Sequence, residues 1–369
     1  MKICKIISLV WVLSLIIPIA KAQNDTTQNN IKMFDFGASY TGDFAGNVTG
    51  GISKGFGYLG YGTLGVAFNT EAAHWWKGGH WVLSGATTHG NCPTEEWLGD
   101  FQVADNIEAG NHIFLQELYF LQEIGPAEIV AGLNDFNALY AFTDHADLFL
   151  NSCFGINSIL SSTFAVPIFP ITSWGLNVKW NITDWLNWQV GAFDSPFGFD
   201  DNPYNIHWRF TSEKGAIVAS EFEFITHIHN ELDGSFKIGA VWQTAQKNIE
   251  VHLCGEQAFW KNQSHSLSAF VFAAYSPKSK SENYCHIAGG LHVDGVFSKS
   301  GKDRLGIGFS TALLNNDFMD ETAVELTYQY AFNEHFYLQP DFQYIINPAG
   351  NEDVKGNPLF MAMRFGIDF

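Results

Sequence analysis

The chain has 369 residues with 19 basic and 38 acidic side chains, which gives a formal net charge of −19. So acidic a chain does not suit binding to nucleic acid or to an anionic surface, because both repel negative charge. Only 15% of the residues are charged and 15% are aromatic, at a mean hydropathy of −0.02, which excludes a bundle of apolar transmembrane helices and favours many short strands.

The N-terminus has the pattern of a secretory signal peptide. Lys2 and Lys5 flank the start of an apolar run over 6–19, and Ala20-Lys21-Ala22 fits the small-residue cleavage rule. The run is shorter than the ~20 residues that a membrane-spanning helix needs, and it contains Pro18. We therefore expect residues 1–22 to be removed on export, which takes away three lysines and leaves a formal charge of −22. A short polar periplasmic segment, 23–32, would follow.

From residue 33 onward the chain alternates between apolar and polar residues with a period of two. In the segment 322–332, Val324 and Leu326 lie on one face, and Glu325 and Thr327 on the other. An apolar outer face opposite a polar or small inner face is typical of a barrel with lipid outside and water inside. A soluble β-sandwich with a core of aromatics is the alternative, and it does not explain the missing polar outer face. Sixteen candidate strands begin near residues 33, 58, 79, 112, 127, 173, 185, 215, 235, 250, 266, 285, 304, 322, 335 and 357.

The predicted connections alternate between short and long. Outer-membrane barrels have even strand numbers, short periplasmic turns and longer outer loops. We therefore predict an all-β fold, a sixteen-stranded antiparallel transmembrane β-barrel over residues 33–369, with both termini on the periplasmic side. The loop 137–172 is too long for a plain connection and is expected to fold into the barrel mouth. The short connections are 123–126, 182–185, 229–234, 261–265, 298–303 and 333–335, and the long ones include 89–111, 137–172 and 195–214.

The last strand ends on Phe369, at the outer face of a period-two pattern. This strand must pair with the first one near 34–40, because an unpaired edge cannot face lipid. A terminal phenylalanine after alternating aromatics also resembles the signal that the barrel-assembly machinery recognises. Outer-membrane lipid and this machinery are therefore expected partners.

Six stretches along the chain, taken together, carry a family resemblance: "WKGGHWV" (76–82), "GDFQVADNIEA" (99–109), "LQELYFLQ" (115–122), "AGLNDFNALYAF" (131–142), "FLNSCFGINSIL" (149–160) and "YLQPDFQYIINPAG" (337–350). In this order they resemble the carbohydrate-selective porin family of the OprB type. The resemblance implies a sixteen-stranded outer-membrane barrel that passively admits sugars and has inward-folded loops. One departure concerns Leu133, which stands where the family commonly has a basic residue between the positions of Gly132 and Asp135, so the family's constriction would be weakened or rebuilt here.

Candidate pore-lining and solute-binding residues come from two sources. Glu117 and Asp135 lie within the family-like stretches beside the long loops. Alternation places seven more on the inner wall, where polar groups can replace water around sugar hydroxyls: Lys179, Glu221, Glu223, Glu325, Asp341, Gln343 and Arg364.

No catalytic residue, metal site or cofactor is predicted. The stretch "GISKG" (51–55) matches a nucleophile-elbow pattern, but that motif needs a strand–turn–helix setting, and here it lies between predicted strands. The favoured function is passive, carbohydrate-preferring diffusion of mono- or oligosaccharides in the outer membrane of a Gram-negative-type bacterium. A general or cation-preferring porin is the alternative, and a barrel-borne hydrolase is less favoured.

The sequence leaves two structural questions open. The first is whether the barrel forms a homo-oligomer. The second concerns Cys92 and Cys153, which fall in two predicted outer loops. They could form a disulfide that pins the constriction, or they could be free thiols, since cysteine is among the most buried residues.

Overall fold

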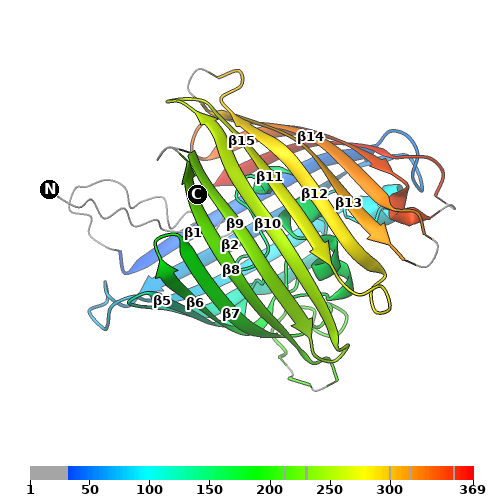
Figure 1. The fold of residues 1–369 in the computed structure, drawn as a ribbon. Coiled ribbons are helices and arrows are strands. Elements are labelled where there is room, and N and C mark those ends of the chain that lie inside the picture. The colour runs from blue at the N-terminus through cyan, green and yellow to red at the C-terminus, as the bar shows by residue number, and fades with distance from the viewer. Residues whose placement is uncertain are drawn as a thin grey trace.

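A computed structural model describes residues 32–208, 210–211, 213–228, 232–298, 301–315, 318–351 and 354–369. The predicted signal peptide and almost all of the segment 23–32 lie outside these residues. The described residues form one closed antiparallel barrel in which every strand pairs with its sequence neighbours, as Figure 1 shows. Each strand begins within three residues of its predicted start, so the predicted sixteen-stranded barrel is confirmed.

The strands β1 to β16 occupy, in order, Phe34–Asn47, Gly55–Asn69, Gly79–Gly90, His112–Ile124, Ala127–Asn134, Ser173–Thr183, Leu186–Asp194, Ala216–Ile228, Leu232–Gln243, Asn248–Lys261, Ser266–Tyr275, Asn283–Asp294, Asp303–Leu314, Glu321–Ala331, Phe336–Ile346 and Leu359–Asp368. The long loops gather at one end of the barrel and the short turns at the other, where both the first and the last strand have their free ends. In the following we call these the long-loop end and the short-turn end.

The barrel closes where β16 pairs with β1. The register runs from Ser39 opposite Asp368 to Asn47 opposite Phe360, and the Phe369 amide donates to the Ala38 carbonyl at 2.9 Å. The Phe369 side chain is 72% exposed, as expected for the outer-face end of a closing strand. Closure satisfies the backbone groups of both edge strands, which a lipid environment requires.

The outer wall carries large apolar side chains. Trp180, Ile307 and Phe309 are each 45–50% exposed, because alternation turns them away from the lumen. A soluble protein rarely exposes such a continuous apolar surface, whereas lipid covers it at no cost. Within the described residues, no helix is both long and apolar enough to span a membrane.

The inner wall departs from the sequence prediction, which expected only polar or small residues there. Phe193, Ile217, Val241 and Phe270 point inward and are no more than 1% exposed. They are buried because a loop packs on them: Phe193, Ile217 and Val241 form one apolar cluster with residues of the loop 135–172. Apolar inner positions therefore mark where the loop rests against the wall.

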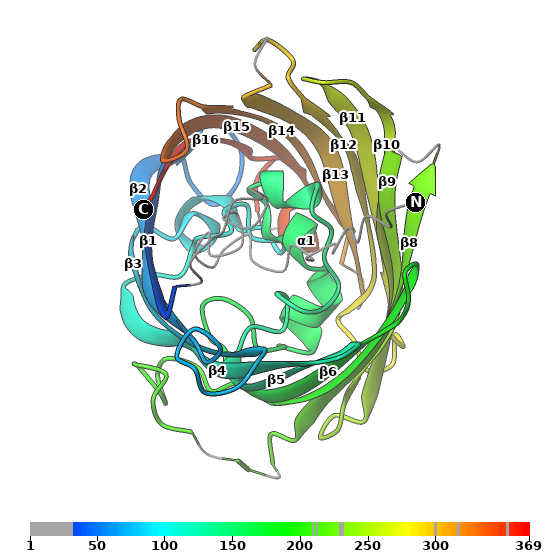
Figure 2. The same ribbon diagram turned by 90° about the vertical axis from the view of Figure 1, so that its left-hand side faces the viewer.

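The loop 135–172 enters the barrel from the long-loop end. Figure 2 looks into the barrel and shows the helical segments of this loop inside the ring of strands. They are η2 (Ala146–Leu148), α1 (Ser152–Gly155) and η3 (Ile159–Thr163). Two inward glycines of β13 make room for the loop, since a Cβ at Gly306 would lie 2.7 Å from Phe149 and one at Gly308 2.9 Å from Phe154.

Two shorter segments of the long-loop end also carry helical turns. The loop 91–111 contains η1 (Thr94–Leu98), and the β15–β16 loop contains η4 (Pro348–Gly350). Trp97 and Leu98 are buried in an apolar cluster with Leu59, Ala323 and Phe360 of the barrel wall. The first loop therefore packs against the inside of the barrel beside the loop 135–172.

Candidate functional site

Carboxylates of the inner wall hold the inward loop by its backbone. Glu325 on β14 accepts from the Leu150 amide at 2.6 Å and from the Asn151 amide at 3.0 Å. Glu221 on β8 accepts from the Ala141 amide at 3.0 Å. Both glutamates are at most 1% exposed. They point into the barrel as alternation predicts, but the loop covers them, so their side chains anchor the loop.

Asp341 and Gln343 on β15 extend this set of anchors. The Gln343 amide donates to the Ala104 carbonyl at 2.7 Å and to Asp341 at 3.1 Å, and it accepts from the Asn151 side chain at 3.3 Å. Asp341 and Gln343 are fully buried. Gln343 therefore ties the loops 91–111 and 135–172 to one strand of the wall, and Asp341 orients the Gln343 amide.

Arg364 on β16 joins the seam of the barrel to the loop 91–111. Its guanidinium donates to both carboxylate oxygens of Asp43 on β1, at 2.7–3.0 Å. It also donates to Asp105 at 3.1 Å and to Asn106 at 2.8 Å. Arg364 is 7% exposed and both aspartates are fully buried, so its positive charge is neutralised within the wall.

Asp135 and Glu117 lie near each other at the base of the inward loop. Asp135 accepts from the Asn137 amide at 2.7 Å and from the Phe169 amide at 3.1 Å, which links the two ends of the loop. Burial raises the pKa of Asp135 to about 6 despite these hydrogen bonds. Glu117 accepts from the Ser84 hydroxyl at 3.0 Å and is 1% exposed. Asp135 therefore fixes the base of the loop, whereas Glu117 is held by Ser84 of the neighbouring wall strand β3.

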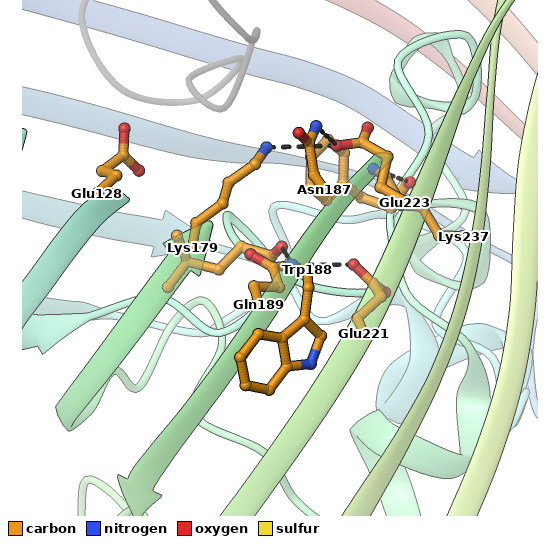
Figure 3. Close-up of a pocket in the computed structure, with 10 residues that line it drawn as sticks. Glu128, Lys179, Asn187, Trp188, Gln189, Glu221, Glu223 and Lys237 are labelled. Carbon is orange, nitrogen blue, oxygen red and sulfur yellow. Dashed lines mark hydrogen bonds and ion pairs between the residues drawn. The ribbon is translucent and has the colours of Figure 1, made fainter. Parts of the chain in front are cut away.

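Lys179 and Glu223 remain beside a polar pocket, which Figure 3 shows. The Lys179 ammonium lies 3.3 Å from Glu223, and Glu223 also accepts from Asn187 and Ser235, each at 2.9 Å. The pocket has a water-accessible volume of about 20 Å³, which fits about one water molecule. It is lined by Glu128, Leu139, Phe142, Lys179, Asn187, Trp188, Gln189, Glu221, Glu223 and Lys237.

Charged residues that the sequence prediction missed lie close to this pocket. Lys237 on β9 is 7% exposed, donates to the Phe142 carbonyl at 2.9 Å and lies 3.3 Å from the centroid of the Phe142 ring. Its position between the outward Phe236 and Ile238 is a period-two signal that could have revealed it.

Asp144 is the second missed residue, and it is exposed on the inward loop. Although the Asp144 side chain reaches the lumen, the surrounding protein displaces much of its water, and this partial desolvation, together with the negative charge of Glu256, raises the pKa of Asp144 to about 7. No sequence signal marks it beyond its place in the long loop, because its neighbours come from strands far away in the chain. Asp144 therefore adds a titratable acidic group to the lumen side of the loop.

The structure offers no support for chemistry at the sequence motifs. Residues 51–54 lie in the connection between β1 and β2, and Gly55 begins β2, which is a strand–loop–strand setting. The Ser53 hydroxyl donates to the Glu96 carbonyl at 2.8 Å. Among the described residues, no group of three or more His, Cys, Asp or Glu could hold a metal ion. Cys92 and Cys153 are free cysteines, so the hypothesis of a disulfide between them is wrong: Cys153 is buried in α1 of the loop 135–172, and its Sγ donates to the Gln102 carbonyl.

A closed barrel with an apolar outer wall, a polar inner wall and loops folded into the lumen is the architecture of a porin, a channel of the bacterial outer membrane. The model of the carbohydrate-selective porin, OprB family, matches residues 53–249 and 245–369, and the chain belongs to this family.

Named relatives agree with this assignment. Porin B of Pseudomonas aeruginosa is 22% identical over 413 aligned positions, which cover 92% of this chain and 88% of the relative. A protein of Acinetobacter baylyi named "Putative porin QuiX" is 23% identical over 242 positions, and the match covers 50% of this chain and about half (53%) of that protein.

Solved structures show the same fold. The high-pH structure of Pseudomonas putida OprB superimposes with a TM-score of 0.81 at 20% identity, covering 91% of this chain and 94% of that chain. The low-pH structure of the same protein gives a TM-score of 0.61 at 19% identity, covering 91% and 92%.

Proposed function

We propose that the barrel is a passive pore that prefers carbohydrates and admits mono- or oligosaccharides into the periplasm. The observation that carries the proposal is a lumen narrowed by the loop 135–172, within a chain of the carbohydrate-selective porin family. Narrow passages select solutes by the hydrogen-bonding groups that line them. Here Lys179, Asn187, Gln189 and Glu223 present donors and acceptors side by side on the wall.

The balance of charge on the wall suits neutral solutes. Lys179 is paired with Glu223, and Arg364 with Asp43 and Asp105. Lys237 is covered by Phe142. None of these cations is therefore left unpaired to attract an anionic solute. A neutral sugar can still bind, because its hydroxyls can form hydrogen bonds with the paired groups without changing the net charge of the wall.

The long-loop end also offers a polar entrance. An open hollow of about 470 Å³ lies there, which is large enough for a small sugar. Its lining consists of hydroxyl, amide and charged groups, the types that bind sugar hydroxyls: Ser162, Thr163, Gln246, Lys280 and Glu282.

A general, cation-preferring pore is the second candidate, and one observation favours it. Asp144 is exposed on the loop and lies near Glu256, Asp147 and Glu223, so acidic groups outweigh free basic ones on this part of the lumen. Such a pore would admit small cations and neutral solutes of any class.

Liposome swelling separates the two candidates. Proteoliposomes with the purified barrel should swell faster in mono- and disaccharides than in size-matched neutral amino acids. Substituting Lys179→Ala should reduce this preference, whereas the control Lys77→Ala should not, because Lys77 lies in a short turn with its side chain 89% exposed. Equal rates for sugars and amino acids in the native protein would leave only the general pore.

We further propose the processing and placement of the chain. Residues 1–22 would be cleaved on export, leaving a periplasmic segment 23–32 before the barrel, and the barrel-assembly machinery would recognise the strand that ends at Phe369. The proposed barrel has no enzymatic activity, and a homo-oligomer is compatible with it. N-terminal sequencing of the protein purified from outer membranes should begin at Gln23, and cross-linking in those membranes reports the oligomeric state. A retained N-terminus would contradict the cleavage.

A further inference from the structure

One row of residues across β8, β9 and β10 is built differently from the rest of the inner wall. Glu221, Gly239 and His252 lie side by side in the strand register. The imidazole Nε2 of His252 is 2.9 Å from Glu221, and its Nδ1 is 2.9 Å from Glu250. Carboxylates accept hydrogen bonds, so both ring nitrogens act as donors, which only the imidazolium form of histidine can do.

Gly239 makes this arrangement possible. The imidazole crosses β9 to reach Glu221 on the next strand, and it passes directly over Gly239. A Cβ at this position would lie 2.4 Å from Nε2 and 2.6 Å from Cε1 of His252. A side chain at this position, even the methyl group of alanine, would therefore push the ring away from Glu221.

The two glutamates beside His252 hold the inward loop at two separated points. Glu221 accepts from the Ala141 amide at 3.0 Å, and Glu250 accepts from the Asn157 side chain at 3.1 Å. The imidazolium thus connects the anchors at both ends of the segment 141–157, which includes α1 (Ser152–Gly155). The side chains of His252, Glu221 and Glu250 are at most 2% exposed.

Charge explains why the cation matters at this place. Two buried carboxylates next to each other repel and lose their hydration, and a cation between them offsets both costs. Without His252, Glu221 would keep only the nearby Lys237 as a cationic neighbour. The other titratable or charged groups that face the row are Tyr140 and Asp144 of the loop, Lys237 of β9, and Cys254 and Glu256 of β10.

We propose that His252 is a cationic positioning residue that fixes the inward loop against the wall and thereby sets the width of the passage. It acts through Glu221 and Glu250 and does not itself touch solute. The proposal rests on the proposed function for its effect on solutes, whereas the position of the loop can be measured without any solute.

A native thiol reports the position of the loop. Cys254 is fully buried, and its Sγ donates to the Phe142 carbonyl of the loop at 3.7 Å. N-ethylmaleimide can alkylate it only when the loop lifts, so the alkylation rate of the folded barrel measures that opening. Peptide mass spectrometry separates Cys254 from the other cysteines, and heat-dependent gel mobility verifies that each variant is folded.

The variants are chosen to separate charge from packing. His252→Gln and Gly239→Ala should each speed alkylation of Cys254 by at least about tenfold, since each breaks a buried ionic contact. His252→Lys keeps a cation and should restore a rate within about threefold of the native protein. The control is His227→Gln, which breaks an exposed pair with Asp233 at the short-turn end and should leave the rate unchanged.

Two further readouts decide the proposal. Histidine nitrogen NMR of the native barrel, assigned by the loss of one signal in His252→Gln, should show both ring nitrogens of His252 protonated at pH 7. Single-channel conductance should rise in His252→Gln and in Gly239→Ala and return toward the native value in His252→Lys. A neutral imidazole, or native alkylation rates in both disruptive variants, would overturn the proposal. Altered alkylation without any sugar preference in the native protein would overturn the proposed function alone.

Discussion

The substitution Arg364→Met tests how the barrel seam is held. Arg364 makes three hydrogen bonds to Asp43, one to Asp105 and one to Asn106. Methionine keeps much of the volume but leaves two fully buried carboxylates without their cation. Breaking a buried ion pair by removing one partner costs about 3–5 kcal/mol, so the free energy of unfolding should fall by about that amount.

The structure supplies controls of matched chemistry. Arg304→Met removes an arginine whose side chain is 36% exposed and lies 3.7 Å from Asp147, so it should cost less than about 1 kcal/mol. The double variant Arg364→Met/Asp43→Asn should lose less free energy of unfolding than the two single variants lose together, because Asp43→Asn removes one of the two buried carboxylates that have lost their cation. Arg364→Lys should be intermediate, since lysine keeps the charge but not the two-pronged geometry.

Denaturant unfolding of the barrel in lipid vesicles measures these differences. Tryptophan fluorescence follows the loss of structure, and heat-dependent gel mobility gives a second probe of the same transition. A loss below about 1 kcal/mol for Arg364→Met, or equal losses for Arg364→Met and Arg304→Met, would refute the reasoning. The seam would then owe its stability to the strand pairing alone.

Three further predictions concern the lumen. Because the pKa of Asp144 is raised to about 7, this residue gains its negative charge as the pH rises through neutrality. The reversal potential in a salt gradient should therefore become more cation-selective between about pH 6 and 8. Asp144→Asn should remove that change, and a potential that is anion-selective throughout would contradict the prediction. Glu325→Gln replaces one of the two oxygens that accept from the Leu150 and Asn151 amides by an NH2 donor and should destabilise the loop by about 1–3 kcal/mol. The effect should appear as larger and noisier single-channel currents, and currents like those of the native pore would count against it. The denatured, unreduced mature protein should titrate as four free thiols, and two missing thiols would reveal a disulfide.

The wall residues show how far alternation carries the prediction of the site. The alternation of side chains along a strand correctly predicts that Glu221, Glu325 and Asp341 point to the inner face, because this alternation does not depend on what surrounds the strand. It does not reveal that a loop covers them, since their partners Ala141, Leu150 and Asn151 come from a distant part of the chain. Whether these side chains meet solute or hold a loop therefore depends on tertiary packing.

Apolar inner positions illustrate the same limit. Phe193 and Phe270 break the expected rule of a polar lumen, because they pack against the inward loop and not against water. The length and aromatic content of the loop 137–172 indicate that it needs apolar partners, but they do not say which strands provide them. The missed Lys237 belongs to the same region, where it lies against Phe142 of that loop.

The sequence by itself determined the number, the order and the facing of the strands, because alternation and turn lengths are local properties of the chain. It also determined that the last strand must pair with the first, since lipid tolerates no open edge. Only the tertiary structure decided which carboxylates became anchors and how His252 came to lie between Glu221 and Glu250. The reason is physical: the charge balance and hydration of a buried group depend on neighbours that closure of the barrel brings together, and neither can be read from residues adjacent in the chain.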